Sequence, residues 1–434
     1  MDANRKKMTM KKTVLGSLGA VAIAIALQFT MANVQAGLFN SCTPCDEVAC
    51  FPCDDSAFCD PCDAVCGPRV KAGKWFLSGH MEAGFFANAY GQKSTYGDAP
   101  FRAGRGADVG SGNTALLYNT RLTGAQVNQV YLSAGKKVDG RHGLDLGGRV
   151  DFTWGSDAFM VQALGMEETA KDPAGWGSGD YYASFAQAYA ELAYGRWNIV
   201  AGKFYAPFGS NPYSASDRFF YTMDQNYVFL PHTAGGAYAS YKVNQNLVVI
   251  AGWAMPEEFG HCTNNNAVLG GLVWNANKVN LRYAFGVGRS SCPLLEGESV
   301  DVFVQSVIAT TQISRKLRYV VDWSFINATL VGGGTEAIYG INNELIYQSN
   351  DKWAFGTRFG VLNANANAAP LFGEDAAAGE WYTVSLGANW TPNEWLVVKP
   401  EIRYDWMDPD GNKPFNGGAK HTQFSGGMSA VVKF

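Results

Sequence analysis

The sequence predicts a 16-stranded antiparallel transmembrane β-barrel, preceded by a short Cys-rich N-terminal segment. Three observations predict this fold class. The 434-residue chain contains 50 Gly, 26 Phe, 20 Tyr and 12 Trp, yet after residue 36 it has no apolar run of the ~18 residues that a membrane helix needs. Short polar turns alternate with longer loops. The segments between them alternate apolar and polar residues with a period of two.

The first 36 residues have the pattern of an export signal. Basic residues from Arg5 to Lys12 precede the apolar run VLGSLGAVAIAIALQFTM, and Val34 and Ala36 stand at the −3 and −1 positions of a small-residue cleavage site. A single membrane anchor is the alternative, against which the cleavage site argues. We expect three parts: a signal peptide (1–36), a Cys-rich periplasmic segment (37–70) and a transmembrane barrel (71–434).

Turns and loops alternate regularly along residues 71–434. The short turns are rich in Asn, Asp, Gly, Pro and Lys; they cover residues 136–142, 195–198, 243–246, 275–278, 314–316, 349–352 and 391–394. The longer loops cover about residues 91–119, 155–180, 206–233, 255–265, 288–299, 327–335, 363–379 and 408–420. Seven turns and eight loops connect 16 strands. An even strand number with short turns on one side is typical of an outer-membrane barrel.

The predicted strands have one apolar and one polar face. In residues 395–406, Ile402 and Tyr404 share the apolar face, whereas Arg403 and Asp405 share the polar face. A soluble exported β-sandwich also alternates. Here, however, charges lie in the middle of strands, as a wet lumen permits, and the apolar face continues for about ten residues, the length of a tilted strand in a bilayer. The pattern therefore favours a membrane barrel.

Tryptophans gather near both ends of the predicted strands. The turn-side group is Trp75, Trp197, Trp274, Trp353, Trp390 and Trp395, and the loop-side group is Trp154, Trp253, Trp323, Trp381 and Trp406. Two such rings are typical of the aromatic girdles at the interfaces of a membrane barrel. Trp381 and Trp395 have the parity of the polar face and fit this interpretation less well.

Several stretches resemble a known family. They are LDLGGRVDFTWGSDA, FAQAYAELAYGRWNIVAGKFYAPFGSNPYS and the closing EIRYDWMDPDGNKPFNGG…FSGGMSAVVKF. From roughly residue 120 to the end the chain resembles the OmpL-like outer-membrane β-barrel porin family, and GKFYAPFG and RYDW…PFN are the most specific pieces. The resemblance implies an outer-membrane diffusion channel. The last strand, which ends at Phe434, resembles the signal that barrel-assembly machinery reads. Residues 37–70 fall outside the family pattern.

Charged residues on the predicted inward face are the candidate pore lining. A transverse electric field from such side chains orients and filters small solutes, whereas a cross-strand charge ladder would only satisfy the lumen wall. The candidates are Arg149, Asp151, Arg282, Arg318, Asp322, Arg358, Glu401, Arg403 and Asp405. They comprise five positive and four negative charges, so the sequence leaves ion selectivity open.

The third long loop is the candidate constriction. It is aromatic-rich and carries Asp217, Arg218 and Asp224. Its apolar content favours a loop that folds into the lumen and narrows it. The alternative is a surface loop that packs against a neighbouring subunit.

The nine cysteines are disulfide candidates. They are Cys42, Cys45, Cys50, Cys53, Cys59, Cys62 and Cys66 in the N-terminal segment, and Cys262 and Cys292 in neighbouring loops. Three C-x-x-C pairs also suit zinc, an iron–sulfur cluster or redox chemistry, but an exported segment favours disulfides. Seven is odd, so one N-terminal thiol is available to an envelope partner. We expect Cys262 and Cys292 to form a loop–loop disulfide.

No catalytic motif stands out, since the five His are scattered and neither G-x-S-x-G nor H-E-x-x-H occurs. We expect no enzyme activity, no cofactor and no metal. The 34 basic and 38 acidic residues form no basic stripe, which argues against nucleic acid as a partner.

The expected function is passive diffusion of small hydrophilic solutes or ions through the outer membrane. We expect the protein to be embedded in lipid as a homo-oligomer, and specifically as a trimer. The alternative is a structural envelope protein, crosslinked through its Cys-rich segment.

Overall fold

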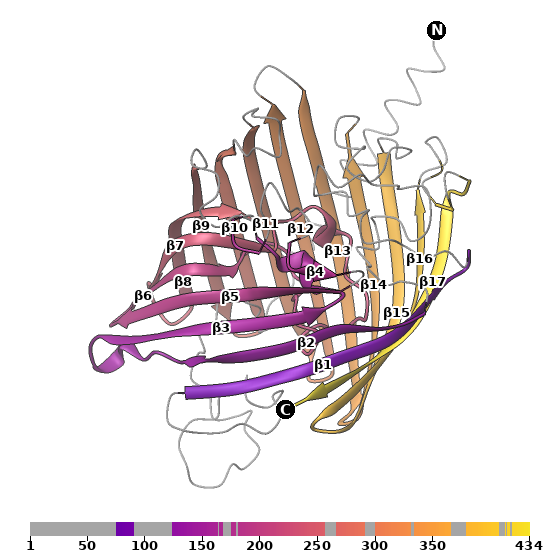
Figure 1. Cartoon of the computed structure of the whole chain (residues 1–434), viewed down its shortest axis with the longest axis horizontal. Coiled ribbons are helices and arrows are strands. Elements are labelled where there is room, and N and C mark those ends of the chain that lie inside the picture. The colour runs from indigo at the N-terminus through magenta and orange to yellow at the C-terminus, as the bar shows by residue number, and fades with distance from the viewer. Residues whose placement is uncertain are drawn as a thin grey trace.

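The computed structural model places the chain in a single curved sheet from Trp75 to the C-terminus (Figure 1). It describes residues 75–90, 124–163, 165–167, 175–178, 181–256, 266–290, 300–330, 334–365, 379–407, 413, 415–416 and 419–434. Among these residues, no helix has the length and apolar character needed to cross a membrane.

The described part of the chain contains 17 strands, all paired antiparallel. Their bounds are β1 (Trp75–Asn88), β2 (Gly124–Lys136), β3 (Asp145–Gly155), β4 (Gly177–Ser178), β5 (Tyr181–Tyr194), β6 (Trp197–Tyr205), β7 (Thr233–Lys242), β8 (Leu247–Pro256), β9 (Asn266–Ala276), β10 (Val279–Ser290), β11 (Val300–Ser314), β12 (Leu317–Leu330), β13 (Thr335–Asn350), β14 (Trp353–Ala364), β15 (Gly379–Asn393), β16 (Leu396–Met407) and β17 (Thr422–Lys433). Short 3-10 helices are η5 (Gly140–His142), η6 (Ala158–Val161) and η7 (Asn226–Val228).

Sixteen of these strands form the barrel, which confirms the predicted strand number. The two-residue β4 is the extra strand; it pairs only with the first residues of β5. The sequence did not predict β4, because two residues are too few to carry an alternation signal.

The barrel closes where the last strand meets the first. β17 pairs with β1 over nine residue pairs, from His80↔Lys433 to Asn88↔Ser425. The terminal residue extends this ladder, since the N–H of Gly79 donates to the carbonyl of Phe434 at 2.8 Å and the N–H of Phe434 donates to the carbonyl of Gly79 at 2.9 Å. The C-terminal strand therefore removes the two sheet edges that an open sheet would expose.

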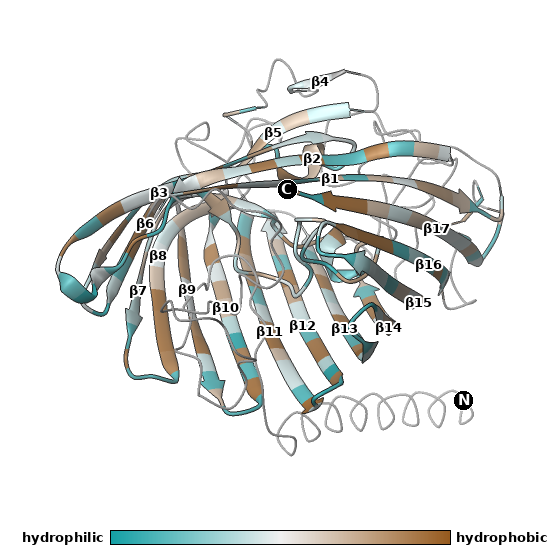
Figure 2. Ribbon diagram, turned by 90° about the horizontal axis from the view of Figure 1, so that it is seen from below, coloured by the Kyte–Doolittle hydropathy of each residue, from teal (hydrophilic) through white to brown (hydrophobic). Residues whose placement is uncertain are grey.

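Side chains alternate between the outer surface and the interior, as the period of two predicts. On β16, Ile402 is 49% and Tyr404 40% exposed, whereas the neighbouring Arg403 and Asp405 are 1% and 0% exposed. Hydropathy therefore changes in bands along the strands (Figure 2). In a bilayer the exposed apolar rows face lipid, because the outer surface of a transmembrane barrel carries an apolar band that contacts the acyl chains.

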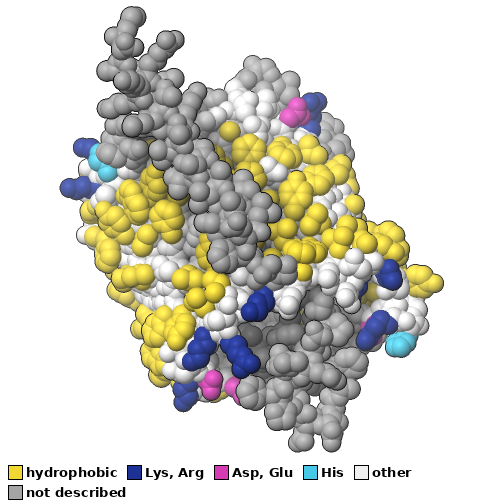
Figure 3. Space-filling view, turned by 180° about the vertical axis from the view of Figure 1, so that it is seen from behind, with side chains coloured by type: hydrophobic (Ala, Val, Ile, Leu, Met, Phe, Trp, Pro, Cys, Tyr) yellow, Lys and Arg dark blue, Asp and Glu magenta, His cyan; other side chains and the backbone are white. Residues whose placement is uncertain are grey.

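Aromatic side chains mark both rims of the outer surface. Trp75, Trp197, Trp353, Trp390 and Trp395 are exposed on the turn side, and Trp154 and Trp253 are exposed on the loop side. In the space-filling view, hydrophobic side chains spread over the outer face, whereas Lys and Arg lie mainly toward its margins (Figure 3). Trp381 is different: it points inward, is 0% exposed and packs against Phe415.

The tight turns use residues that tolerate a left-handed backbone. Between β9 and β10, Asn277 has φ of 37°, and between β5 and β6, Gly195 has φ of 58°. Such conformations match the twist of the two strands in a hairpin. Gly195–Arg196 and Asn277–Lys278 are therefore two-residue turns, as the composition of these segments indicates.

Candidate functional site: the lumen and its folded-in loop

The loop between β6 and β7, residues 206–232, lies inside the barrel against the inner faces of many strands. Tyr213, Phe220 and Tyr221 are at most 4% exposed. We call this segment the lumen loop. Its buried position has a physical cost, because loop backbone removed from water still needs hydrogen-bond partners. The barrel wall supplies those partners.

Arg218 anchors the middle of the lumen loop to β1. Its Nη2 donates to Glu82 at 2.7 Å and to Asp157 at 3.2 Å, and its Nη1 donates to the carbonyl of Tyr213 at 3.0 Å. All three charged side chains are fully buried. Ser429 donates a further hydrogen bond to Glu82 at 2.8 Å. A buried charge is tolerated only when it is paired and hydrogen-bonded in this way.

Two buried arginines of β14 and β16 bind loop carbonyls. Nη1 of Arg358 donates to the carbonyls of Thr222 and Met223 at 3.0 and 3.1 Å. Nη1 of Arg403 donates to the carbonyl of Met223 at 2.8 Å. Glu401, on the same face of β16, accepts from the Thr222 N–H and hydroxyl, both at 2.7 Å. The barrel wall therefore binds both the carbonyl groups of Thr222 and Met223 and the N–H group of Thr222.

Lys399, two residues before Glu401 on β16, also binds carbonyl groups of the lumen loop. Its Nζ donates to the carbonyl of Arg218 at 2.7 Å and to the carbonyl of Ala215. The side chain is 2% exposed. Lys399 has the same parity along β16 as Arg403 and Asp405, so its inward direction could have been predicted from the sequence, although it is not among the predicted pore-lining residues.

The lumen loop also contacts β12 through Ser210, near its start, and β13 through Asp224, in its second half. Asp224 accepts from the N–H of Tyr227 at 2.9 Å and from the side-chain amide of Asn342 at 3.1 Å. Burial, reinforced by the carboxylate of Asp322, raises the pKa of Asp224 from its ordinary 3.8 to about 7. Asp322 itself accepts from the N–H of Ser210 at 2.6 Å.

Inward glycines make room for the side chains of the lumen loop. A Cβ added to Gly340 would lie 2.0 Å from Oδ1 of Asn226, and one added to Gly84 would lie 2.4 Å from the hydroxyl of Tyr221. Gly356 likewise lies under Phe219. The loop therefore lies in direct contact with the strand backbone, which explains why glycine, the residue with no Cβ, occupies these inward positions.

Aromatic rings add to the docking. The Arg358 guanidinium carbon lies 4.1 Å from the centre of the Phe220 ring. The same guanidinium donates through Nε to Glu344 at 3.0 Å. A cation over a ring in a desolvated setting contributes about 2 kcal/mol.

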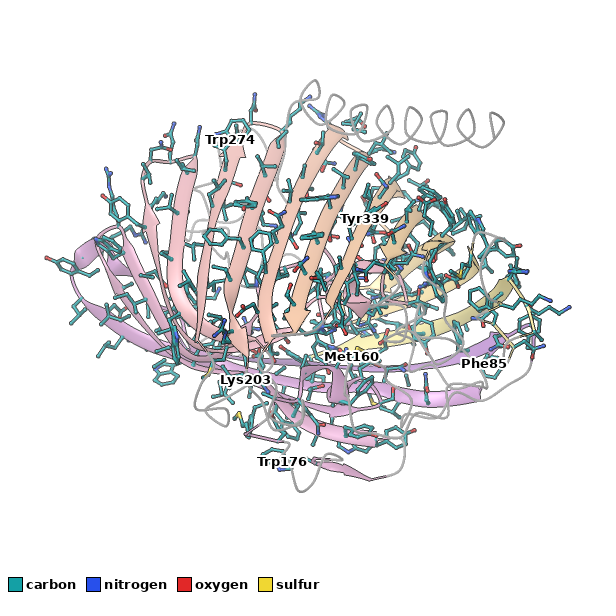
Figure 4. The ribbon with its side chains drawn as sticks, turned by 90° about the horizontal axis from the view of Figure 1, so that it is seen from above. Phe85, Met160, Trp176, Lys203, Trp274 and Tyr339 are labelled. Carbon is teal, nitrogen blue, oxygen red and sulfur yellow. The ribbon has the colours of Figure 1, made fainter. Side chains whose placement is uncertain are left out.

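A second loop segment, which contains η6, also enters the barrel. Ala158, Phe159, Met160 and Val161 are at most 3% exposed, and Met160 lies toward the centre of the view in Figure 4. Nζ of Lys203 donates to both Glu167 oxygens at 2.8 and 2.9 Å and to the carbonyl of Val161 at 2.7 Å. This pair is not among the residues predicted from the sequence. Lys203 shares the parity of the exposed Ile199, but Gly202 before it has φ of 136°, and that conformation breaks the simple alternation.

A further hydrogen-bond network lies on the inner face of β2, β3 and β5. Asp151 accepts from the hydroxyl of Tyr131 at 2.6 Å, from the amide of Gln187 at 2.7 Å and from Nε of Arg149 at 2.8 Å. The Ser133 hydroxyl also donates to this carboxylate. Asp151 is 0% exposed. The network therefore links the inner faces of β2, β3 and β5 around a buried carboxylate.

The nine predicted pore-lining residues all lie on the inward face, but most are covered. The buried ones are Asp151, Arg282, Asp322, Arg358, Glu401, Arg403 and Asp405; Arg149 and Arg318 are partly exposed. Among the predicted constriction residues, Asp217 is exposed, whereas Arg218 and Asp224 are buried. The structure brings Asp322, Arg358, Glu401 and Arg403 together around the lumen loop.

The inner surface has two chemically different walls. The charged wall is formed by the inward side chains Glu82, Asp322, Asn342, Arg358, Lys399, Glu401, Arg403 and Asp405. The apolar wall is formed by Val200, Phe204, Ala234, Tyr238, Val248, Ile250, Ala254, Leu269 and Val273 on β6 to β9. Phe208, near the start of the lumen loop, packs against the apolar wall.

All nine predicted disulfide cysteines lie outside the described residues. Within the described ranges, no three His, Cys, Asp or Glu side chains form a group that could hold a metal ion.

Comparisons with known proteins agree with this architecture. In solved structures the fold is similar to an anion-selective porin from Comamonas acidovorans (TM-score 0.56, 9% identity, 83% of this chain and 99% of that chain). It is also similar to the outer membrane channel DcaP of Acinetobacter baumannii (TM-score 0.53, 13% identity, 85% and 100%). A third similar structure is the outer membrane protein OmpT of Vibrio cholerae in a trimer form (TM-score 0.51, 14% identity, 84% and 100%).

At these identities the structural likeness shows the fold alone. No curated protein matches the sequence. A family model does match: the family described as putative beta-barrel porin-2, OmpL-like, fits residues 77–434, which include the lumen loop and all barrel strands except the first two residues of β1. The chain therefore belongs to the OmpL-like beta-barrel porin family.

Proposed function

We propose that the chain is a passive diffusion channel for small hydrophilic solutes or ions in the outer membrane, with the lumen loop as its constriction. Family membership and the closed 16-stranded barrel support the channel. A barrel of this size encloses a space that side chains of the wall alone do not fill. Passage then needs no cofactor or energy input, because the solute moves down its own gradient.

The fixed lumen loop is the observation that carries the proposal. Arg218, Arg358, Lys399 and Arg403 hold it by hydrogen bonds to loop carbonyls or, for Arg218, by a buried ion pair. A loop held at so many points keeps one position, and the passage that remains beside it keeps one width. The passage therefore selects solutes mainly by their size, and the charges that remain accessible to water add a weaker selection by charge.

Arg149, Arg318 and Asp217 are the proposed solute-contacting charges. They are the predicted pore residues that keep exposed surface, whereas the others are covered by loop or wall contacts. A charge that reaches water acts on a passing ion. A buried, paired charge is largely neutralised by its partner.

Planar-bilayer recording tests the function. We expect stepwise conductance from the purified mature protein and partial block by small sugars that vanishes as the sugar size increases. Absence of any steps from protein that shows the heat-dependent mobility shift of a folded barrel would contradict the channel.

A structural role in the envelope is the second candidate. The buried state of seven predicted pore residues favours it, because a filled lumen would leave the barrel as an anchor. The same recording separates the two, since a filled barrel gives no conductance while it remains folded.

The N-terminal region and the assembly are further parts of the proposal. Residues 1–36 act as a cleaved signal, and residues 37–70 form disulfides in the periplasm, with one thiol left for an envelope partner. Cys262 and Cys292 join two loops. We propose a trimer, supported by the fold likeness to a trimeric structure. Mobility on gels with and without reductant tests the disulfides, and native mass spectrometry tests the subunit number.

A further inference from the structure

A recess lies at the turn-side rim of the barrel, apart from the lumen. It has a volume of about 460 Å³ and is lined by Arg196, Asn244, Gln245, Asn246, Leu247 and Trp274. Trp274 lies at the outer margin of the molecule in Figure 4. The lining combines one guanidinium, three side-chain amides and two apolar side chains, and it includes no carboxylate.

Three neighbouring turns hold the recess in shape. Nη1 of Arg196 donates to the carbonyl of Val243 at 3.0 Å, which ties the β5–β6 turn to the β7–β8 turn. Oδ1 of Asn244 accepts from the N–H groups of Asn246 and Leu247 at 2.8 and 3.0 Å, so the β7–β8 turn is braced from within. The Asn246 carbonyl accepts from the N–H of Asn275 at 2.7 Å, which adds the β9–β10 hairpin. The recess is therefore preformed.

The recess crosses the boundary between the apolar belt and the water-facing turns. Leu247 and Trp274 are cross-strand partners on the outer face. Their rows continue as the exposed Val249 and Trp253 on β8 and Val268 on β9. Arg196 and the three amide side chains lie beyond the strand ends and are exposed. Short turns of an outer-membrane barrel face the periplasm, so the polar half of the recess lies where periplasmic-leaflet headgroups lie.

This arrangement matches a phospholipid headgroup. We propose that the recess binds the phosphate of a glycerophospholipid of the periplasmic leaflet, through Arg196. A guanidinium makes two parallel charge-assisted hydrogen bonds to phosphate oxygens. The amide groups of Asn244, Gln245 and Asn246 are suited to the remaining phosphate and glycerol oxygens, and the acyl chains continue along Leu247 and Trp274. The nearby rings of Trp197 and Tyr241, tilted against each other with centroids 4.7 Å apart, belong to the same interfacial belt.

Native mass spectrometry of the folded protein in detergent tests the site. The probe is phosphatidylglycerol, and the matched probes are diacylglycerol, which lacks the phosphate, and glycerol 3-phosphate, which lacks the acyl chains. We expect Arg196→Gln to weaken phosphatidylglycerol binding about tenfold, as loss of a charged hydrogen bond implies. Arg196→Lys, which keeps the charge and loses the planar fork, should fall between this variant and the wild type.

The control is Arg315→Gln in the exposed β11–β12 turn, which removes the same charge from another part of the rim. It should bind like the wild type. Equal binding by Arg196→Gln and the wild type, or equal loss in Arg196→Gln and Arg315→Gln, would overturn the site. Equal binding of diacylglycerol, or of glycerol 3-phosphate, would also overturn it, because the recess would then recognise the chains alone or a soluble phosphate. Heat-dependent gel mobility verifies that each variant is folded.

Discussion

The charged wall and the apolar wall are made by strands of the same sheet, yet they differ in chemistry and in what covers them. On the charged wall, buried cations donate to the carbonyls of the lumen loop. On the apolar wall, Val248, Ile250 and Val273 belong to one buried apolar cluster, against which Phe208 packs. Between these two walls, inward charges occur where the backbone of the lumen loop must be satisfied. Elsewhere on the inner face, as at Asp151, a buried charge is paired with wall side chains instead.

The difference also bears on selectivity. A lumen charge that is bound to a loop carbonyl fixes the shape of the passage, whereas one that reaches water sets the field along it. Arg403 belongs to the first kind. Arg149 belongs to the second, because its side chain keeps 29% exposure although its Nε is paired with Asp151. Both arginines lie on the polar face of their own strands. Variants that each break one contact test this difference, first on the charged wall and last on the apolar wall.

Replacing Arg218 with Met should give the largest loss of stability. The change leaves Glu82 and Asp157 buried without their cation, and breaking a buried pair from one side costs about 3–5 kcal/mol. Urea unfolding in lipid vesicles measures the loss. Arg141→Met, in the exposed pair with Asp139, is the control and should behave like the wild type. Equal midpoints for the two variants would contradict the anchoring role of Arg218.

Replacing Gly340 with Ala should destabilise the protein by about 1–3 kcal/mol, as other overpacked interiors are. The new methyl group would collide with Oδ1 of Asn226. The same change in an Asn226→Ala background should cost much less, because the obstructing amide is gone. A double-mutant cycle of unfolding free energies measures the coupling, and strict additivity of the two changes would be the contrary result.

The stability of the folded protein should also depend on pH through Asp224 of the lumen loop, with a smaller effect per pH unit than the two substitutions above. Its pKa is raised in the folded protein to about 7, so the folded state holds the proton more tightly than the unfolded chain does. The associated stability is complete below about pH 4 and is lost as pH rises toward 7, by about 1 kcal/mol per pH unit within that window.

The measurement is the difference in unfolding free energy between pH 5 and pH 6 for the wild type and for Asp224→Asn. The wild type should lose more stability than the variant, because the variant no longer titrates at this position. Identical changes with pH in the two proteins would show that Asp224 is not the group responsible.

Replacing Ile250 with Val on the apolar wall should give the smallest effect. Deleting one buried methylene costs about 1 kcal/mol, and no loop carbonyl loses a donor. Unfolding midpoints and single-channel conductance should both stay near wild type. A conductance change as large as that of a charged-wall variant would show that the two walls do not differ in the way described.

Much of the barrel was predictable from local pattern. Alternation placed Ile402 and Tyr404 outside and Arg403 and Asp405 inside, because a strand permits only two directions. Turn chemistry located the seven hairpins for the same local reason: residues such as Asn277 and Gly195 adopt conformations that other residues avoid.

The partners of the inward residues were not predictable. Parity shows which way Arg403 and Lys399 point, but their acceptors are the carbonyls of Met223 and Arg218, some 180 positions away in sequence. A backbone carbonyl carries no residue-specific signal. Trp381 likewise has the composition of a girdle residue, and only the tertiary packing places it against Phe415 inside the barrel.

Single-channel conductance of Lys399→Met tests the central claim most directly, namely that buried cations of the charged wall hold the lumen loop and so set the passage. This change removes the donor to the carbonyls of Ala215 and Arg218 and preserves the length of the side chain. Lys316→Met is the matched control, since Lys316 donates to the carbonyl of Ser349 at an exposed turn. We predict a higher conductance and a larger sugar exclusion limit for Lys399→Met, and wild-type values for Lys316→Met. Wild-type values for both folded variants would contradict the account.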